Sequence, residues 1–221
     1  MIYLPPQRQI MNLVQMESKV QTLERKLWDI FLIAAPFLSA TGTFFWENGD
    51  FGVNGGTIGV ISSLFWIPVF IGLFSLLRDK MPYYATIGLL IAIYGCIGGI
   101  NFSFEGFYAA VLNISHEMSV QAFADHPWQT NLMLWWPGPL FPLSLLVLGI
   151  NLTRSKSVSL WAGILLSLGA VAFPLSRIPR IDLIAHVVDI LLFIPAAYLG
   201  WNFLNNKDIR YSFDMSLKPV N

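Results

Sequence analysis

The sequence predicts an all-α integral membrane protein built as a bundle of six transmembrane helices. Apolar residues make up 55% of the 221 residues and charged residues only 12%, about half of the charged share of roughly 25% that soluble domains carry. The charged residues are clustered in short segments between long apolar runs. A helix needs about 20 apolar residues to cross a hydrocarbon core of roughly 30 Å. Helices are expected because lipid offers no water to satisfy open backbone.

Six apolar runs reach this length. We expect spans at about residues 28–46, 57–77, 83–104, 132–152, 158–176 and 183–204. They form one domain, 27–206, because no connecting segment is long enough to separate two. A polar segment, 1–26, precedes this domain, and a short tail, 207–221, follows it.

The distribution of basic residues predicts that both termini face the cytoplasm. With the N-terminus inside, all of the 13 Lys and Arg residues except Arg177 and Arg180 fall in inside segments. Cytoplasmic loops of membrane proteins carry such an excess of Lys and Arg. Tryptophans near the ends of the spans suit the two membrane interfaces. A bacterial inner membrane is the default location for a small chain of this kind.

The segment from Gln7 to Lys26 is predicted to form an amphipathic cytoplasmic helix. Its apolar residues alternate at spacings of three and four: Leu13, Met16, Val20, Leu23, Leu27 and Ile30. This is the a/d pattern of a coiled coil, with Lys19 at a g position and Glu24 at an e position. Two interpretations stay open. The helix either lies on the cytoplasmic face and extends the first span, or joins copies of the chain into a homo-oligomer.

The longest outside loop, 105–131, contains no Lys or Arg. Its moderately apolar part from Gly106 to Ala124 is typical either of an interfacial or re-entrant helix or of a third span that continues beyond the membrane. The fourth span opens in a proline-rich run with Pro137, Pro139 and Pro142. Prolines are tolerated in the first turn of a helix, so we expect a helix start at the interface with a bend at Pro142.

A polar stripe on the sixth span is the strongest candidate for a functional site. Asp182, His186 and Asp189 lie at i, i+4 and i+7, within an arc of about 60° at roughly 100° per residue. Asp189 lies about 10 Å deeper than Asp182, given the rise of about 1.5 Å per residue. Ionisable groups at such depth face the bundle interior or a water-filled cavity.

Two interpretations of this stripe involve the nearby arginines. In the first, Asp182, His186 and Asp189 line an outward-open pocket for an ion, a proton or a small polar ligand. The rim of that pocket is formed by Arg177 and Arg180, and Glu105 is a further candidate ligand from the outer loop. In the second, the charges pair internally and hold the fifth and sixth spans together. Arg177 and Arg180 break the positive-inside trend, which calls for compensating partners such as Asp182 and Asp189.

A third interpretation is a metal site. His186 with His116 and His126 could supply a histidine and carboxylate site that leaves a position open for water, as in a metal-dependent intramembrane hydrolase. The spacing is not that of a dedicated metal motif, and HExxH is absent from the sequence.

Other function classes find little support in the sequence. The chain lacks a serine nucleophile elbow, a phosphate loop and GxGxxG. Its formal net charge of zero gives no field to attract nucleic acid, and a single cysteine, Cys96, excludes an internal disulfide. The sequence therefore favours a non-enzymatic membrane protein with an outward polar pocket, and it leaves the cofactor unknown. The alternatives are an accessory or scaffold subunit, acting through the N-terminal helix and glycine-rich helix faces, and the hydrolase.

Overall fold

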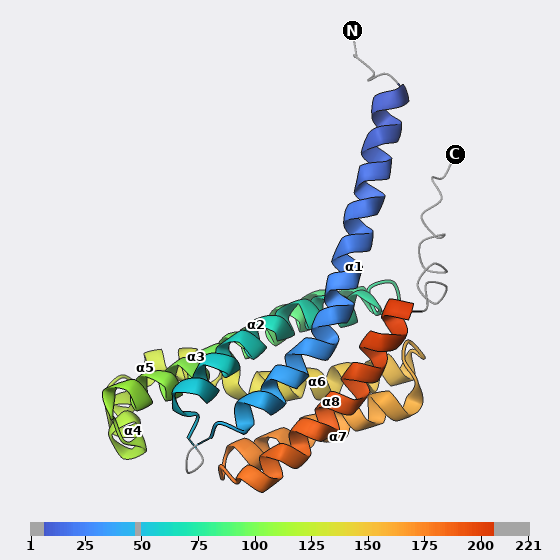
Figure 1. Ribbon diagram of the computed structural model, residues 1–221. Coiled ribbons are helices and arrows are strands. Elements are labelled where there is room, and N and C mark those ends of the chain that lie inside the picture. Colours follow the sequence, from blue (N-terminus) through green and yellow to red (C-terminus); the bar gives the residue numbers. More distant parts are fainter. Residues whose placement is uncertain (1–6, 47–49, 206–221) are drawn as a thin grey trace.

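The computed structural model describes residues 7–46 and 50–205, apart from the side chains of residues 7–14 and of His116. Within this part the regular elements are helices (Figure 1), so the predicted all-α fold is confirmed. The first half of the chain holds α1 (Gln7–Thr43), α2 (Gly52–Ser75) and α3 (Pro82–Leu112). The second half holds α4 (His116–Ala124), α5 (Pro127–Thr130), a π-helix η1 (Asn131–Trp135), α6 (Pro137–Arg154), α7 (Leu160–Arg177) and α8 (Asp182–Asn205).

Five helices in the described part of the chain are long and apolar enough to cross a membrane. They are Gly52–Ser75, Pro82–Leu112, Pro127–Arg154, Leu160–Arg177 and Asp182–Asn205. The first predicted span lies in the second half of α1, which is less apolar because it contains Asp29 and several Ser, Thr and Gly residues before ending at Thr43. The span at residues 28–46, and with it the total of six spans, therefore stays a prediction.

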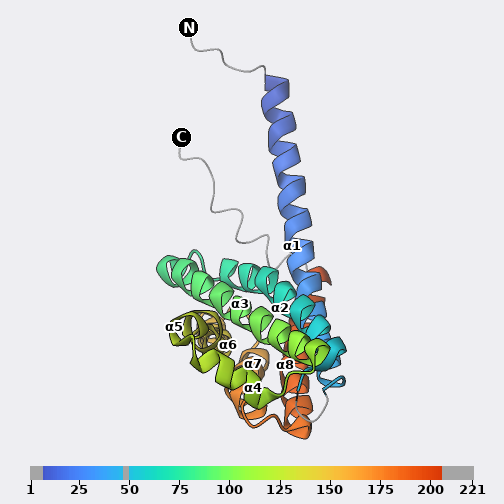
Figure 2. The ribbon, with the colours of Figure 1, turned by 90° about the vertical axis from the view of Figure 1, so that its left-hand side faces the viewer.

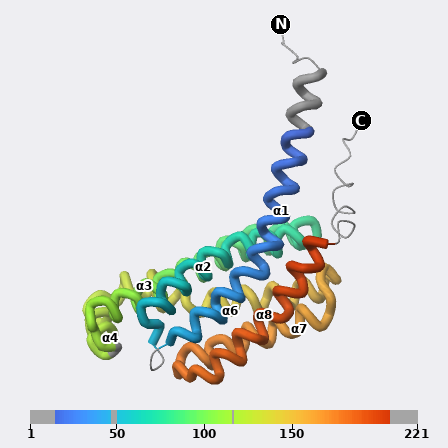
Figure 3. Tube along the Cα trace, in the orientation of Figure 1, coloured from blue at the N-terminus to red at the C-terminus, as the bar shows by residue number. Residues whose placement is uncertain are grey.

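The long helices form a closed ring in chain order. α1 packs against α2, α2 against α3, α3 against α6, α6 against α7, α7 against α8, and α8 packs back against α1. Figure 3 shows the chain turning back at alternate ends of this ring. The N-terminal part of α1 continues out of the ring, beyond the ends of the other helices (Figure 2). Ring closure by α1 and α8 brings residues from the two ends of the chain together.

Aromatic side chains fill the middle of the ring. Trp66 and Phe70 of α2 meet Phe141 of α6 edge-on, with ring centroids 5.3 and 5.8 Å away. The helices approach closely at glycines. A Cβ on Gly95 would lie 2.5 Å from the backbone nitrogen of Phe141, and one on Gly200 would lie 2.7 Å from the carbonyl oxygen of Asp29. Small residues let membrane helices approach in this way.

Most of the connection between α3 and α6 is helical. α3 continues to Leu112, beyond the predicted span end at 104, and the short helix α4 follows it. The helix that leads into α6 begins at Pro127, before the predicted start at 132, and it passes through the π-helix η1.

The π-helix follows from Pro137. Trp136 donates its backbone N–H to the carbonyl of Asn131, and Pro137 has no N–H to donate, so the carbonyls of Leu132 and Met133 lose their helical donors. Two side chains of α3 replace those donors. The hydroxyl of Tyr94 donates to Leu132 at 2.5 Å and the amide of Asn101 to Met133 at 2.8 Å.

Candidate functional site

Arg177, Asp189 and Thr43 form a closed polar cluster at one end of the ring. Arg177 Nη2 lies 2.7 Å from Asp189 Oδ1 in an ion pair. The Thr43 hydroxyl donates to Asp189 Oδ2 at 2.6 Å and accepts from Arg177 Nη1 at 3.3 Å. The cluster joins the last residue of α1, the last residue of α7 and the second turn of α8. The structure thus brings together two of the residues that the sequence singled out, Arg177 and Asp189.

Burial in the cluster is unequal. Asp189 is 2% exposed, whereas the Arg177 side chain is 18% exposed. The guanidinium carbon of Arg177 lies 4.7 Å from the ring centre of Trp46 and 5.1 Å from that of Phe173. A cation over an aromatic face is attracted by the ring quadrupole. Arg177 therefore covers the carboxylate on its solvent side and is itself held between two aromatic rings.

A second arginine–aspartate pair lies at the same end. Arg180, in the turn between α7 and α8, pairs with Asp50, which lies two residues before the start of α2. Asp50 is well exposed, with 53% of its side chain accessible. Exposed pairs of this kind contribute little to stability. This pair therefore links the turn between α7 and α8 to the segment before α2 without burying a charge.

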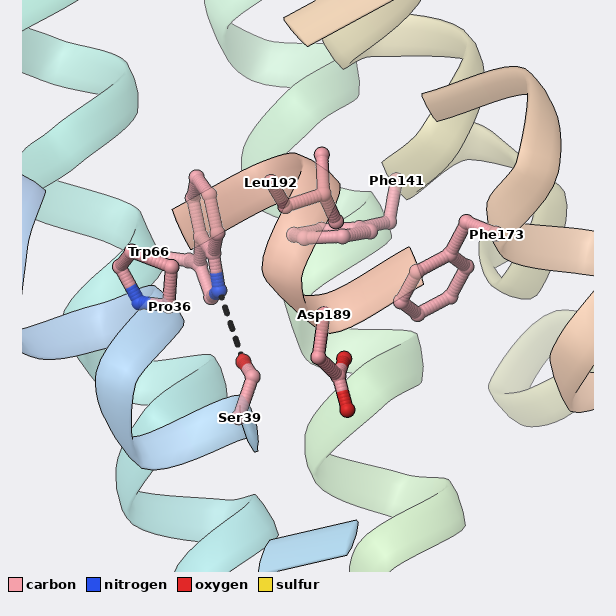
Figure 4. A pocket seen from close by; sticks show the side chains of 7 residues that line it. All are labelled: Pro36, Ser39, Trp66, Phe141, Phe173, Asp189 and Leu192. Atoms are coloured by element: carbon pink, nitrogen blue, oxygen red, sulfur yellow. Dashed lines mark hydrogen bonds between the residues drawn. The ribbon is translucent and has the colours of Figure 1, made fainter. Parts of the chain in front are cut away.

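A small cavity adjoins Asp189 on the interior side. It is lined by Pro36, Ser39, Trp66, Phe141, Phe173, Asp189 and Leu192 (Figure 4). Its volume is about 10 Å³, close to the smallest space that holds one water molecule. The carboxylate and the Ser39 hydroxyl supply polar groups to this wall, so the cavity has partners for a bound water or proton carrier.

A chain of hydrogen bonds leads inward from the cavity. Trp66 Nε1 donates to Ser39 Oγ at 3.2 Å, as Figure 4 shows, and Ser39 and Ser62 share a hydrogen bond of 2.6 Å. Ser62 donates to the carbonyl of Ala35 at 3.0 Å. Since each hydroxyl has one proton, these contacts are satisfied together if Ser39 donates to Ser62. The chain ends on the backbone of α1.

The other predicted site residues lie around this cluster rather than within it. Asp182 is exposed at the start of α8, and His186, one turn deeper, is half-buried with its ring 4.4 Å from that of Phe44. Glu105 is half-buried on α3, a helix that neighbours α2 and α6 in the ring, so it lies on a different wall from Asp189.

The metal interpretation concerns His186, His116 and His126. Among the residues that the structure describes, no three His, Cys, Asp or Glu side chains gather closely enough to hold a metal ion. The side chain of His116 lies outside the described residues.

Thr43, Trp46 and Ser39 were not found from the sequence. Ser39 and Thr43 are one helical turn apart, so they share a face of α1, which is a weak signal in a helix with several Ser and Thr residues. Trp46 was read only as an interfacial residue. What selects these residues is the pairing of α1 with α8, which brings together positions that are 146 residues apart.

Comparison with protein family models, with curated proteins and with solved structures gave no match to this chain. The class of protein follows from the fold. Five apolar helices of spanning length in an all-helical bundle indicate an integral, multi-pass membrane protein.

Proposed function

We propose that the protein spans the membrane six times, with both termini in the cytoplasm and the Arg177 cluster on the outer side. The span to be added to the five apolar helices is the part of α1 from Trp28 to Thr43. Its packing supports this assignment, because it lies along two apolar helices, α2 and α8, and closes the ring. The Lys and Arg distribution supports the orientation. A bacterial inner membrane is the location that we propose with it.

We propose further that the outer cluster binds an ion, a proton or a small polar ligand, in a transport or sensing role. The observation that carries this proposal is the Asp189 carboxylate, buried in an apolar helix beside a water-sized cavity. Ionisable groups inside membrane helices are costly and mark ion paths, proton relays and ligand sites. Here Asp189 takes the ligand, and Arg177 is its resident counter-ion.

The geometry allows Asp189 to exchange its partner within the chain, Arg177, for a ligand from outside. A ligand that binds Asp189 has to displace Arg177, which is partly exposed and lies in the last turn of α7. Its guanidinium can turn toward water, where its charge is solvated, without unfolding a helix. The size of the cavity favours a proton or a water-sized ion over a larger ligand. Asp182, His186 and Arg180 lie at the mouth of this path.

Thermal melts of the purified protein in mild detergent test the proposal. The probes are protons, Na⁺ and K⁺, varied at constant ionic strength, because a ligand that binds only the folded state raises the melting temperature. We expect at least one probe to shift the wild-type transition and to lose that effect in Asp189→Asn. The matched control is Asp79→Asn, which removes an exposed carboxylate in the turn between α2 and α3, away from this path, and should keep the shift.

Two results would overturn this proposal. Equal shifts in wild type and Asp189→Asn would place binding elsewhere. A wild-type transition that none of the probes moves would leave Arg177 and Asp189 as an internal pair that only joins α7 and α8.

The scaffold alternative also rests on a specific observation. The cytoplasmic part of α1 exposes large apolar side chains outside the ring, and this surface has no role in the Asp189 site.

A further inference from the structure

The exposed part of α1 carries an apolar seam on one side. Between Gln7 and Ala35 the chain has no glycine or proline, and α1 runs through this stretch as one helix. Packing against the ring begins at Trp28, which lies directly against Gly72 of α2. A Cβ added to Gly72 would lie only 2.9 Å from the Cβ of Trp28. On the N-terminal side of Trp28 the helix extends away from the ring (Figures 1 and 2).

The seam has the repeat of a coiled coil. Met16 and Leu23 at d positions are each 59% exposed, and Val20 at an a position is 50% exposed. Leu27 and Ile30 continue the pattern and are also exposed. Isolated exposed apolar residues are ordinary, but a continuous apolar stripe marks an interaction site.

The repeat continues into the ring without a shift in register. Phe37 and Phe44 occupy the next two d positions, and both are exposed. Exposed d positions thus recur every seven residues from Met16 to Phe44. The a positions among them are Ala34 and Thr41, so the full apolar a/d seam covers the segment from Leu13 to Ile30.

Between Gln15 and Lys26 the positions outside the seam are polar. Ser18 and Arg25 fall at f, opposite the seam, with Gln15, Gln21 and Thr22 at b and c. A helix with one narrow apolar seam and a polar back suits a two-stranded coiled coil. It suits a membrane surface less well, because the N-terminal part of α1 extends away from the ring and does not fold back across its end (Figures 1 and 2).

Charges beside the seam select the direction of pairing. In a parallel pair the g residue of one helix faces the e residue of the following heptad on the other, which brings Lys19 of each chain to Glu24 of its partner. In an antiparallel pair, g faces g and e faces e, which opposes like charges at these same positions. Two copies in one bilayer also extend their α1 helices from the same side, so the membrane favours the parallel arrangement.

We propose that two copies of this chain associate through α1 as a parallel coiled coil on the cytoplasmic side, with Met16, Val20, Leu23 and Leu27 in the interface. The Lys19–Glu24 pairs set direction and register. The membrane holds the two helices at a high effective concentration, which offsets the short length of the segment outside the bilayer. This dimer does not depend on ligand binding at Asp189.

Cysteine cross-linking of the purified full-length protein in nanodiscs tests the geometry. Met16→Cys and Leu23→Cys place thiols at d, where the two copies of a residue face each other. Ser18→Cys places a thiol at f, away from the partner. The wild-type chain is the negative control for cross-linking, because its single cysteine, Cys96, is buried. We expect both d variants to form disulfide-linked dimers at least about ten times faster than the f variant, since only thiols with closely spaced Cβ atoms can bridge.

Charge reversal tests the register independently. Lys19→Glu and Glu24→Lys should each weaken the dimer about five- to thirty-fold, because each opposes like charges twice across the symmetric interface. The double variant Lys19→Glu/Glu24→Lys should restore it. Native mass spectrometry of the detergent-released protein gives the dimer fraction, and the Asp189→Asn variant should dimerise as wild type does.

Several outcomes would overturn the proposal. Cross-linking at Ser18→Cys as fast as at Leu23→Cys would place the seam elsewhere. Cross-linking at only one of the two d positions would indicate antiparallel helices. A monomer, or a complex with a different chain, would show that a second copy is not the partner. A double charge variant as weak as the single ones would exclude this register.

Discussion

Replacing either partner of the buried ion pair should have unequal effects on stability. In Arg177→Ala the Asp189 carboxylate remains 2% exposed and keeps only the Thr43 hydroxyl as donor. Removing one partner of a buried pair costs about 3–5 kcal/mol, because the other charge stays buried without compensation. The variant also loses two cation–aromatic contacts.

The reciprocal change, Asp189→Asn, should cost much less. The amide has nearly the volume of the carboxylate, and its one oxygen can accept from either Thr43 or Arg177, so one hydrogen bond is lost, at about 1 kcal/mol. Arg177 stays between Trp46 and Phe173, and its side chain is 18% exposed, so water can solvate the unpaired cation. We expect a total of about 1–2 kcal/mol, below the cost of about 3–5 kcal/mol for Arg177→Ala.

Equilibrium unfolding in mixed micelles with increasing sodium dodecyl sulfate measures both free energies. Arg180→Ala is the matched control, since it removes the neighbouring arginine from an exposed pair and should cost about 1 kcal/mol or less. The reasoning fails if Asp189→Asn destabilises as much as Arg177→Ala. It also fails if Arg180→Ala costs as much as Arg177→Ala, because burial would then not be the cause.

Two further predictions concern helix packing. Gly200→Ala should destabilise the protein by about 1–3 kcal/mol, because the added Cβ would lie 2.7 Å from a backbone oxygen of α1. Gly42→Ala is the control in the same unfolding assay. It should be close to neutral, because its Cβ would have no neighbour nearer than 3.5 Å. Tyr94→Phe removes the donor to the carbonyl of Leu132 and should cost about 0.5–1.5 kcal/mol, with faster amide exchange around the π-helix in hydrogen–deuterium exchange measurements. No change in exchange there would show that the Tyr94 hydroxyl does not hold this turn.

The helical fold could be predicted because the bilayer admits few alternatives for long apolar runs. The ends of the helices were harder to predict, since a helix does not have to stop where the hydrocarbon stops. α3 continues for eight residues past the predicted end at 104. The π-helix had a signal in the sequence, since Pro137 removes a donor, but the replacement donors come from α3 and depend on how two helices pack.

The polar stripe shows what helical periodicity can and cannot predict. Periodicity correctly placed Asp182, His186 and Asp189 near one face of α8, yet only Asp189 is buried. The difference is depth along the helix, because the first turn of α8 extends past the packed part of the ring, and Asp182 is exposed there. The sequence offered Arg177 and Arg180 as equal partners for Asp189. The structure assigns Arg177 to Asp189, and Arg180 instead pairs with Asp50.

The position of Thr43 links the Arg177–Asp189 cluster to the closure of the whole ring. α1 and α8 meet at one end of the ring where Thr43 donates to Asp189, and near the other end where Gly200 lies against Asp29. The α1 positions of these two contacts are separated by about 20 Å of helix. A slip of one helical turn, about 5.4 Å, would carry the Thr43 hydroxyl away from the Asp189 carboxylate. Their hydrogen bond therefore requires this register of α1 against α8, so the geometry around Asp189 depends on how the two helices pack along their whole interface, including the close approach of Asp29 and Ile33 to Gly200.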